Sequence, residues 1–338
     1  MEKVLVTGGL GYIGSHTAVV LAQAGYEVEI VDNLSNSDLR ALGRISELAG
    51  REVKFHRLDL LDEKATDRLF EETKPDGVIH FAGLKAVGES VSDPQRYYQV
   101  NLGSTLSLTK AMAAHGCRTL VFSSSATVYA ENPVQPLPES ATLGAANPYG
   151  RTKLMIEEIL ADLYHADPRW QIAALRYFNP VGAHPSGRIG ENPRGIPNNL
   201  VPFLTQVATG QREYLAVFGN DYPTPDGTGV RDYIHVMDLA EAHQVALAYL
   251  TKHGGHHTWN LGSGQGHSVL QVIQAFEEAN QIAIPYQIAP RRPGDIALYY
   301  ADPSLARAEL GWHTTRNLHD MCRDAWSWQR NNPDGYNS

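Results

Sequence analysis

The chain has 338 residues, with 28 Lys and Arg against 37 Asp and Glu, a formal net charge of −9, and 43% hydrophobic residues. This is the composition of an ordinary globular protein, and the length suffices for one large hydrophobic core or two smaller ones without disulfides or structural metals. The acidic residues are spread along the chain, and Lys and Arg form no run. The chain therefore lacks the basic patch that binding to a phosphate backbone requires, and we expect no nucleic-acid partner.

The two cysteines, Cys117 and Cys322, lie far apart and in no metal-ligand or redox spacing, so two buried or half-buried thiols are expected. No apolar stretch approaches the roughly 20 residues of a membrane span, and the first residues run directly into a strand-like pattern. We therefore expect a cytoplasmic protein that does not bind a membrane.

Short β-branched segments alternate with helical patterns through the first half of the chain. The predicted strands are Val4 to Thr7, Glu27 to Val31, Val53 to Leu58, Gly77 to Phe81, Thr119 to Ser123 and Ile172 to Leu175. Strands separated by helices are typical of α/β proteins with a Rossmann-type, doubly wound parallel sheet. After Phe178 the chain becomes rich in Pro and Gly, as in residues 192–197 and 221–227. This change predicts a smaller C-terminal α/β lobe, with domains at 1–178 and 179–338 and a frayed tail at 331–335.

A glycine pattern follows the first predicted strand. Gly8, Gly11 and Gly14 precede the helical run from Ser15 to Ala24. Glycines at this spacing permit a tight turn, close approach of backbone N–H groups to a pyrophosphate and close helix-to-strand packing. The pattern is GxxGxxG rather than the GxGxxG of many dehydrogenases, and a purely structural turn is the alternative. Its place in the first βα unit, with Asp32 eighteen residues past Gly14, favours a dinucleotide site.

Asp32 also indicates which dinucleotide is expected. A carboxylate at that strand end accepts hydrogen bonds from both ribose hydroxyls and repels a 2′-phosphate, which favours NAD over NADP. Asp59, at the end of the third strand, and residues 81–85, at the end of the fourth, are expected to line the cofactor. The alternative for both is capping of their own strands.

Two other patterns receive structural interpretations. A second glycine cluster, residues 260–267, has neither an acidic partner nor a βαβ context, so we expect a turn that leads into the helical run from Val269 to Ala279. His253, His256 and His257 have a metal-like composition but no carboxylate or cysteine at ligand spacing. A solvated loop is expected there, and no metal site is expected in the chain.

Tyr149 and Lys153 are predicted to lie one turn apart on one face of a helix, because apolar residues recur at helical spacing from Leu154 to Leu160. A phenol with a pKa of roughly 10 is a poor base near neutrality unless a cation favours its phenolate. Lys153 and a positively charged nicotinamide ring are such cations. The alternative is an ordinary amphipathic helix with a surface Tyr and Lys. Ser125 follows the fifth strand, at the edge where doubly wound folds place their sites, so its hydroxyl is expected to hydrogen-bond the reacting oxygen.

Ser125, Tyr149 and Lys153, together with the glycine-rich turn, resemble the extended short-chain dehydrogenase/reductase superfamily. Residues 81–90, 123–129, 176–185, 227–236 and 289–295 narrow the resemblance to its UDP-glucose 4-epimerase family, and the similarity covers nearly the whole chain. The resemblance implies an NAD-dependent isomerase of galactose metabolism that interconverts UDP-galactose and UDP-glucose. It also implies a homodimer joined through helices at about 94–115 and 149–165. The chain departs from the family pattern in two places. Ala130 stands where the family commonly has Gly, and Gly103-Ser104 differs in the segment after Asn101, near the cofactor contacts expected around Val100.

The resemblance further implies a role for each catalytic residue. Tyr149 removes the proton of the sugar 4-hydroxyl while NAD+ takes the hydride from the adjoining carbon. Lys153 lowers the pKa of the phenol and binds the cofactor ribose, and Ser125 polarises the 4-keto intermediate. The ketose then turns in the site and takes the hydride back on its other face, so that tightly bound NADH never leaves.

The resemblance extends to two larger sets of residues. The set expected at the cofactor is Gly8, Gly11, Tyr12, Ile13, Gly14, Asp32, Asn33, Leu34, Ser35, Asn36, Ser37, Asp59, Leu60, Phe81, Ala82, Gly83, Leu84, Lys85, Ser125, Tyr149, Lys153 and Phe178. The set expected at the substrate is Lys85, Ser125, Tyr149, Asn179, Asn199, Leu200, Ala216, Val217, Phe218, Arg231, Arg292, Asp295 and Tyr299.

Within the substrate set, Arg231 and Arg292 suit bidentate contact with the pyrophosphate, and a surface salt bridge is the alternative for each. Asp295 is expected at a ribose hydroxyl, and residues 216–218 at the uracil. Tyr299 is expected to limit the room beside the sugar 2-substituent, which favours UDP-glucose and UDP-galactose over their N-acetyl forms.

Three other functions compete with epimerisation. Nucleotide-sugar 4,6-dehydratases share the scaffold, but their elimination uses an adjacent Asp-Glu pair where this chain has Ala126 and Thr127. A sugar-nucleotide decarboxylase or another epimerase of the superfamily is a second alternative. An NAD-sensing regulatory protein is a third, although such a protein has no need to keep Ser125, Tyr149 and Lys153 together.

Overall fold

The computed structural model describes residues 2–130, 134–193, 195, 197, 199–292 and 295–337. The chain forms two compact units. Unit 1 comprises Met1–Glu131, Ser140–Tyr177 and Ala240–Trp259, and unit 2 comprises Asn132–Glu139, Phe178–Leu239 and Asn260–Ser338. The chain passes from unit 1 to unit 2 after Tyr177, next to the predicted boundary at 178. Two segments differ from the predicted division, because residues 132–139 belong to unit 2 and residues 240–259 belong to unit 1.

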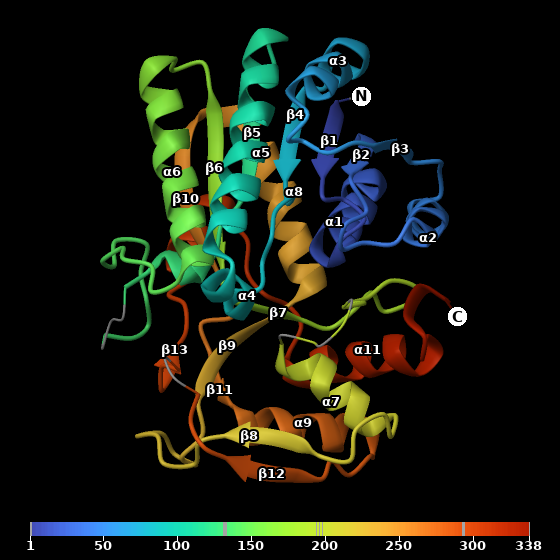
Figure 1. Cartoon of the computed structure of the whole chain (residues 1–338), viewed down its shortest axis with the longest axis vertical. Coiled ribbons are helices and arrows are strands. Elements are labelled where there is room, and N and C mark those ends of the chain that lie inside the picture. Colours follow the sequence, from blue (N-terminus) through green and yellow to red (C-terminus); the bar gives the residue numbers. More distant parts are fainter. Residues whose placement is uncertain are drawn as a thin grey trace. The chain divides into compact units, whose positions relative to one another are not determined.

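Unit 1 is built on a seven-stranded sheet with strand order β10-β6-β5-β4-β1-β2-β3 (Figure 1). Its strands are β1 (Lys3–Thr7), β2 (Glu27–Asp32), β3 (Lys54–Arg57), β4 (Gly77–His80), β5 (Thr119–Ser123), β6 (Gln171–Tyr177) and β10 (Gly255–Leu261). The pairs among β1 to β6 are parallel. All six predicted strands are therefore confirmed, and the order, which reverses direction at β1 and β4, is that of a doubly wound Rossmann-type sheet.

Helices follow the strands of unit 1. They are α1 (Tyr12–Gln23), α2 (Arg40–Ala49), α3 (Glu63–Thr73), α4 (Val87–Ser92), α5 (Pro94–Ala114), α6 (Pro148–Ala166) and most of α8 (Val236–His253), with a short 3₁₀ turn, η1 (Ala126–Val128). Helices α3, α5 and α6 pack in a row and close one hydrophobic core over the sheet, to which Phe70, Leu108 and Ile156 contribute. The central strands are apolar on both faces, as parallel strands covered by helices require.

The loop predicted at the histidines is a strand instead. His253 ends α8, and His256 and His257 lie in β10, where the His257 ring stacks on Trp259 with 5.0 Å between centroids. Trp259 is fully buried, so the segment is held by its aromatic side chain as well as by its backbone. The described residues contain no group of three His, Cys, Asp or Glu side chains placed to hold a metal ion.

Unit 2 contains two small sheets. Strand β9 (Val230–His235) pairs with β11 (Gly266–Ser268) on one edge and with β13 (Leu298–Tyr299) and β7 (Asn179–Val181) on successive parts of the other. Strand β8 (Leu215–Phe218) pairs in parallel with β12 (Tyr286–Ala289). Helices α7 (Leu200–Ala208), α9 (Val269–Asn280) and α11 (Leu318–Asn331) share a second core with these strands, and α10 (Ser304–Leu310) completes the helices assigned to this unit.

The end of the chain does not fray as predicted. The buried Asn332 donates from Nδ2 to the carbonyls of Gly187 and Trp328, at 2.9 and 2.8 Å. The ring of Tyr336, in η2 (Gly335–Asn337), packs on Trp328 with 4.9 Å between centroids. Composition alone suggests a loose Asn- and Pro-rich tail, but these side chains fix it to α11.

Both cysteines are buried free thiols, as predicted. Burial raises the pKa of each thiol to about 12, which leaves both protonated and unreactive near neutral pH. Among the described residues, none of the helices combines the length and the apolarity that crossing a membrane requires.

Candidate active site

The glycine-rich turn connects β1 to α1 and leaves no room for a side chain at Gly8, Gly9 or Gly14. Gly8 has a φ of +66°, and a Cβ on Gly14 would lie 2.4 Å from the Gly8 carbonyl oxygen. Gly11 is the N-cap of α1 and brings no capping side chain. The N-terminus of α1 therefore has no capping side chain, an arrangement that suits the pyrophosphate of a dinucleotide.

Asp32, at the end of β2, organises the adjoining loops. Its carboxylate accepts hydrogen bonds from Leu10 N at 3.2 Å, Leu34 N at 2.9 Å and Ser37 Oγ at 2.7 Å. Asn33 in turn donates to Asp59 Oδ2 at 3.1 Å. The predicted cofactor residues at the ends of β2 and β3 are thus connected to one another, and Asp32 also reaches the glycine-rich turn through Leu10 N.

The segment after β4 is held by two buried residues that the sequence analysis missed. Asn101 of α5 accepts from Leu84 N at 2.8 Å, and its Nδ2 donates to Leu84 O at 3.1 Å and to Thr152 Oγ1 at 2.9 Å. His80 lies between Thr7 Oγ1, at 2.7 Å, and Thr105 Oγ1, at 3.0 Å. Burial, aided by the charge of Lys153, lowers the pKa of His80 to about 3, so this ring is neutral.

The predicted catalytic residues meet within unit 1. Helix α6 starts at the N-cap Asn147, whose side chain accepts from Gly150 N at 2.9 Å, and this start places Tyr149 and Lys153 one turn apart as predicted. Ser125 is the N-cap of η1, where its Oγ accepts from Thr127 N at 3.2 Å and from Thr127 Oγ1 at 3.0 Å. Its side chain also lies close enough to Tyr149 to lower the pKa of that phenol. Lys153 Nζ donates to Ser123 O at 2.7 Å and lies 5.9 Å from the centroid of the Tyr149 ring.

Burial governs the protonation of this cluster. It raises the pKa of Tyr149, against the smaller lowering effect of the Ser125 hydrogen bond. It also lowers the pKa of Lys153 to about 8, against the opposing charge of Glu157. In the protein alone Tyr149 is therefore a neutral phenol near pH 7, and Lys153 keeps most of its charge.

A buried ion pair lies one turn beyond Lys153. Arg176 Nη2 donates to Glu157 Oε2 at 2.6 Å, and its Nε lies 3.0 and 3.2 Å from the two carboxylate oxygens. Ser124 Oγ also donates to Glu157, and Arg176 Nη1 donates to Tyr129 Oη at 3.1 Å. These contacts compensate two charges that would otherwise be costly to bury.

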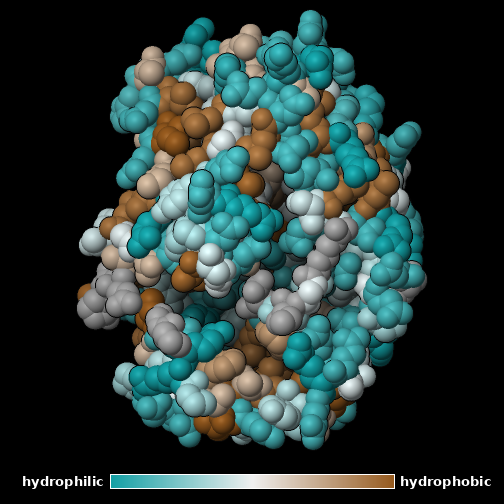
Figure 2. Space-filling view, in the orientation of Figure 1, coloured by the Kyte–Doolittle hydropathy of each residue, from teal (hydrophilic) through white to brown (hydrophobic). Residues whose placement is uncertain are grey.

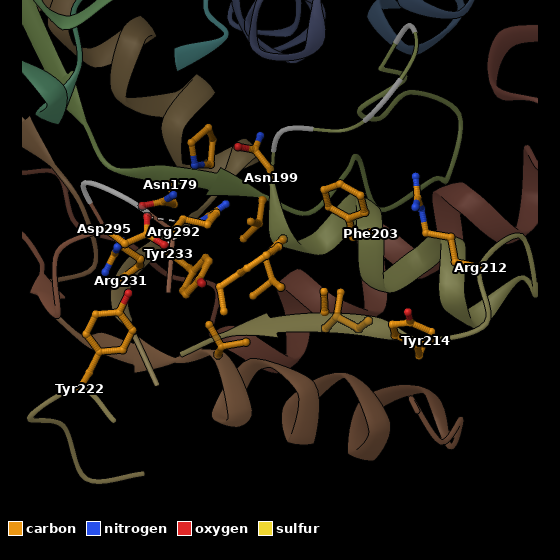
Figure 3. A pocket seen from close by; sticks show the side chains of 18 of the residues that line it. Asn179, Asn199, Phe203, Arg212, Tyr214, Tyr222, Arg231, Tyr233, Arg292 and Asp295 are labelled. Atoms are coloured by element: carbon orange, nitrogen blue, oxygen red, sulfur yellow. Dashed lines mark hydrogen bonds and ion pairs between the residues drawn. The ribbon is translucent and has the colours of Figure 1, made fainter. Parts of the chain in front are cut away.

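Unit 2 contains a cavity of about 690 Å³ between β7, β8, β9 and α7 (Figure 3). Of the predicted substrate residues, it is lined by Asn179, Asn199, Leu200, Ala216, Phe218, Arg231, Arg292 and Asp295. The side chain of Val217 is instead fully buried in the core, which leaves only its backbone for a ligand. Lining residues that the sequence analysis missed include Phe203, Tyr214, Tyr222, Tyr233 and Val269.

The two predicted phosphate-binding arginines gather at one end of this cavity (Figure 3). Arg292 Nε and Nη2 donate to the Asp295 carboxylate at 2.8 and 3.2 Å, and its guanidinium lies 4.9 Å from the centroid of the Phe218 ring. Arg231 Nη1 donates to Val230 O at 2.9 Å. The salt bridge considered as an alternative for Arg292 is thus present, and its partner is another predicted substrate residue.

The second glycine cluster forms the predicted turn, and it surrounds a carboxylate of the protein itself. The buried Asp232 accepts from Ser263 N at 2.8 Å, Gly264 N at 3.0 Å and Ala301 N at 3.1 Å. Because Ala301 follows β13, Asp232 also fixes the strand that carries Tyr299. The Tyr299 ring lies 5.5 Å from that of Phe178, centroid to centroid, and its backbone pairs with Arg231.

The sequence matches known proteins over almost its whole length. Residues 5–325 match the family model described as GDP-mannose 4,6 dehydratase. A UDP-glucose 4-epimerase of Bacillus subtilis is 57% identical over 335 residues, which are 99% of each chain. A UDP-glucose 4-epimerase of Mus musculus is 55% identical over 343 aligned residues, with 99% of each chain covered.

Solved structures resemble the chain equally closely. The UDP-glucose-4-epimerase of Stenotrophomonas maltophila, with bound NAD and formylated UDP-arabinopyranose, has a TM-score of 0.96 at 52% identity and covers 98% of both chains. The enzyme of Bifidobacterium longum, in complex with NAD+ and UDP, has a TM-score of 0.93 at 51% identity and covers 98% of this chain and 99% of its own.

Proposed function

The chain belongs to the GDP-mannose 4,6 dehydratase family and, within it, to the UDP-glucose 4-epimerases, and on that basis we propose which of its residues carry the reaction. The activity is the NAD-dependent interconversion of UDP-galactose and UDP-glucose by transient oxidation at sugar carbon 4. The observation that supports the residue assignment best is the proximity of Ser125, Tyr149 and the buried Lys153 to one another within unit 1.

Tyr149 is the acid and base of the proposed mechanism. Its Oη takes the proton of the 4-hydroxyl and returns a proton after the ketose has turned over in the site. Ser125 shares that proton network and donates to the oxygen of the 4-keto intermediate. Bound NAD supplies the acceptor and donor of the hydride. Lys153 binds the cofactor ribose and favours the Tyr149 phenolate, and it does so only while it is charged, below a pH of about 8.

The cofactor is assigned to unit 1. The backbone from Gly8 to Gly14 binds the pyrophosphate, and Asp32 accepts from the adenosine ribose, with the loop at 33–37 beside it. Residues 81–85, positioned by Asn101, lie at the nicotinamide half. The neutral His80 supports this segment, because Thr7 Oγ1, which contacts its ring, also accepts from Ala82 N at 3.3 Å.

Unit 2 is assigned to the nucleotide of the substrate. Arg231 and Arg292 bind the diphosphate, Asp295 accepts from the ribose, and the backbone around Ala216 with the Phe218 ring holds the uracil. Because Arg292 pairs with Asp295 in the protein alone, binding exchanges that pair for one contact to phosphate and one to ribose. The assignment makes unit 1 the NAD-binding domain and unit 2 the main UDP-sugar-binding domain.

Dehydration, the reaction for which the matching family model is described, is not proposed for this chain. Elimination of water from a nucleotide sugar needs an acid and a base next to the serine. Ala126 and Thr127 occupy those positions, and neither side chain has a pKa suited to that role.

A homodimer formed through α5 and α6 is also proposed. These helices pack side by side and expose Leu106 and Met155, which are 51% and 38% accessible. Figure 2 shows apolar residues gathered over the same two helices. Burial of this surface against a second copy would remove it from water. We expect sedimentation at micromolar concentration to give the mass of a dimer, and a monomer would contradict the proposal.

We infer that the enzyme acts in galactose metabolism and that it is located in the cytoplasm. The two free thiols support the location, because free thiols persist in reducing compartments. Fractionation of the producing cells tests this location, and recovery of the enzyme outside the cytoplasm would contradict it.

Incubation of the purified enzyme with UDP-galactose tests the catalytic assignment. We expect UDP-glucose to form, and Tyr149→Phe to lower kcat by about 100-fold or more, because the phenol is the acid and base. Tyr164→Phe, on the same helix, is the matched control and should keep the rate. Equal rates for the Tyr149→Phe variant and the wild type would refute the assigned role. A 4-keto-6-deoxy product would indicate dehydration instead.

A further inference from the structure

The loop between β8 and β9 carries a tyrosine whose ring is fixed from two sides. A Cβ on Gly219 would lie 2.6 Å from a ring carbon of Tyr222, and the Arg291 guanidinium lies 4.0 Å from the ring centroid on top of it. Arg291 is itself held by Asp221, at 2.6 Å. Tyr222 N donates to Gly227 O at 2.9 Å, which closes the loop. The orientation of the phenol is therefore set by its packing.

The hydroxyl of this phenol is buried and has no hydrogen-bond partner in the described part of the chain. Tyr222 is 6% exposed, and its Oη makes no hydrogen bond to any residue that the structure describes. The side chain lines the cavity of unit 2 and points toward the end where Arg231, Arg292 and Asp295 gather (Figure 3). Buried hydroxyls are normally hydrogen-bonded, because leaving one unsatisfied costs free energy. The ligand of the cavity is the natural source of the missing partner.

The chemistry of that end of the cavity indicates which part of the ligand the hydroxyl meets. Arg231 and Arg292 offer only donors, so neither accepts the Tyr222 proton. Their charges attract an anion, and the oxygens of a diphosphate are strong acceptors. We propose that the Tyr222 hydroxyl donates a hydrogen bond to the diphosphate of the nucleotide sugar, an inference that rests on the function proposed above.

Tyr222→Phe tests this contact with little disturbance, because phenylalanine keeps the packing on Gly219 and Arg291 and removes only the hydroxyl. We expect the Kd for UDP, measured by calorimetry, to rise about tenfold, the equivalent of about 1.4 kcal/mol. The Kd for uridine, which has no phosphate, should stay unchanged. The melting temperature of the ligand-free variant should not fall, because no hydrogen bond within the protein is lost. Tyr286→Phe, which changes an exposed tyrosine of β12, is the matched control and should bind UDP as the wild type does.

The outcomes separate this inference from the proposed function. Equal UDP affinity for Tyr222→Phe and the wild type would overturn the contact. Equal weakening of UDP and uridine binding, or a lowered melting temperature without ligand, would also overturn it, because either result indicates a structural role. Failure of the wild type to bind UDP would contradict the proposed function itself.

Discussion

Replacement of the buried Lys153 by methionine should stabilise the ligand-free protein while it abolishes catalysis. The two side chains have similar length and shape, but methionine carries no charge. Burial lowers the pKa of Lys153 from 10.5 to about 8, and this difference corresponds to about 3 kcal/mol that the charged form costs the folded protein. Loss of the hydrogen bond from Nζ to Ser123 O offsets about 1 kcal/mol of this gain. The expected net gain at pH 7 is therefore about 2 kcal/mol.

The gain should depend on pH with a defined sign. Since the pKa of Lys153 is lower in the folded protein than in the unfolded chain, the unfolded chain binds more protons between about pH 8 and pH 10.5. Wild-type stability therefore rises through that range relative to a variant without the lysine, and the advantage of Lys153→Met should fall by about 2 kcal/mol between pH 7 and pH 10.

Urea denaturation of the ligand-free proteins at both pH values measures this effect. Lys64→Met, at an exposed position of α3, is the matched control and should change the free energy of unfolding by less than about 0.5 kcal/mol. A Lys153→Met variant that is less stable than the wild type at pH 7 would refute the reasoning. An advantage that stays constant between pH 7 and pH 10 would refute it as well.

Three further predictions concern the ion pair, the pH profile and the specificity. Urea denaturation should show that Arg176→Met lowers the free energy of unfolding by about 3–5 kcal/mol, and that the double variant with Glu157→Gln recovers much of this loss. An Arg176→Met variant as stable as the wild type would contradict the prediction. Initial rates of UDP-galactose conversion should decline above a pH of about 8 as Lys153 loses its proton, and a flat alkaline profile would contradict its role. The wild type should convert UDP-N-acetylglucosamine poorly and Tyr299→Ala should convert it at least about tenfold better relative to UDP-galactose; efficient wild-type turnover would refute the assignment to Tyr299.

Local patterns in the sequence were enough to predict the parts of the site that lie close together in the chain. The positive φ of Gly8 and the close approach of Gly14 to the Gly8 carbonyl arise within seven residues, and the pairing of Tyr149 with Lys153 follows from one turn of helix. The parallel, doubly wound sheet also follows from the alternation of strands and helices along the chain. These features need no knowledge of tertiary contacts.

The missed features depend on contacts between distant segments. Asn101 joins Leu84 to Thr152, and nothing near it in the sequence indicates that a helical asparagine is buried. The sequence around the histidines of β10 predicts a polar loop, because it does not show that Trp259 is buried and stacks on His257. Tyr222 belongs to a Pro- and Gly-rich stretch that predicts only a loop. Its importance follows from a hydroxyl that has no partner among the described residues and from its place at the cavity.

The path of the hydrogen at sugar carbon 4 tests the central claim most directly. UDP-galactose carrying deuterium at that carbon is incubated with the purified enzyme, without added NAD, and the UDP-glucose formed is examined by mass spectrometry and NMR. The account predicts that the deuterium is kept at carbon 4 and that no free NADH accumulates, because the hydride leaves and returns on a resident cofactor. Exchange of the label with solvent, or release of NADH as the sugar is oxidised, would contradict it.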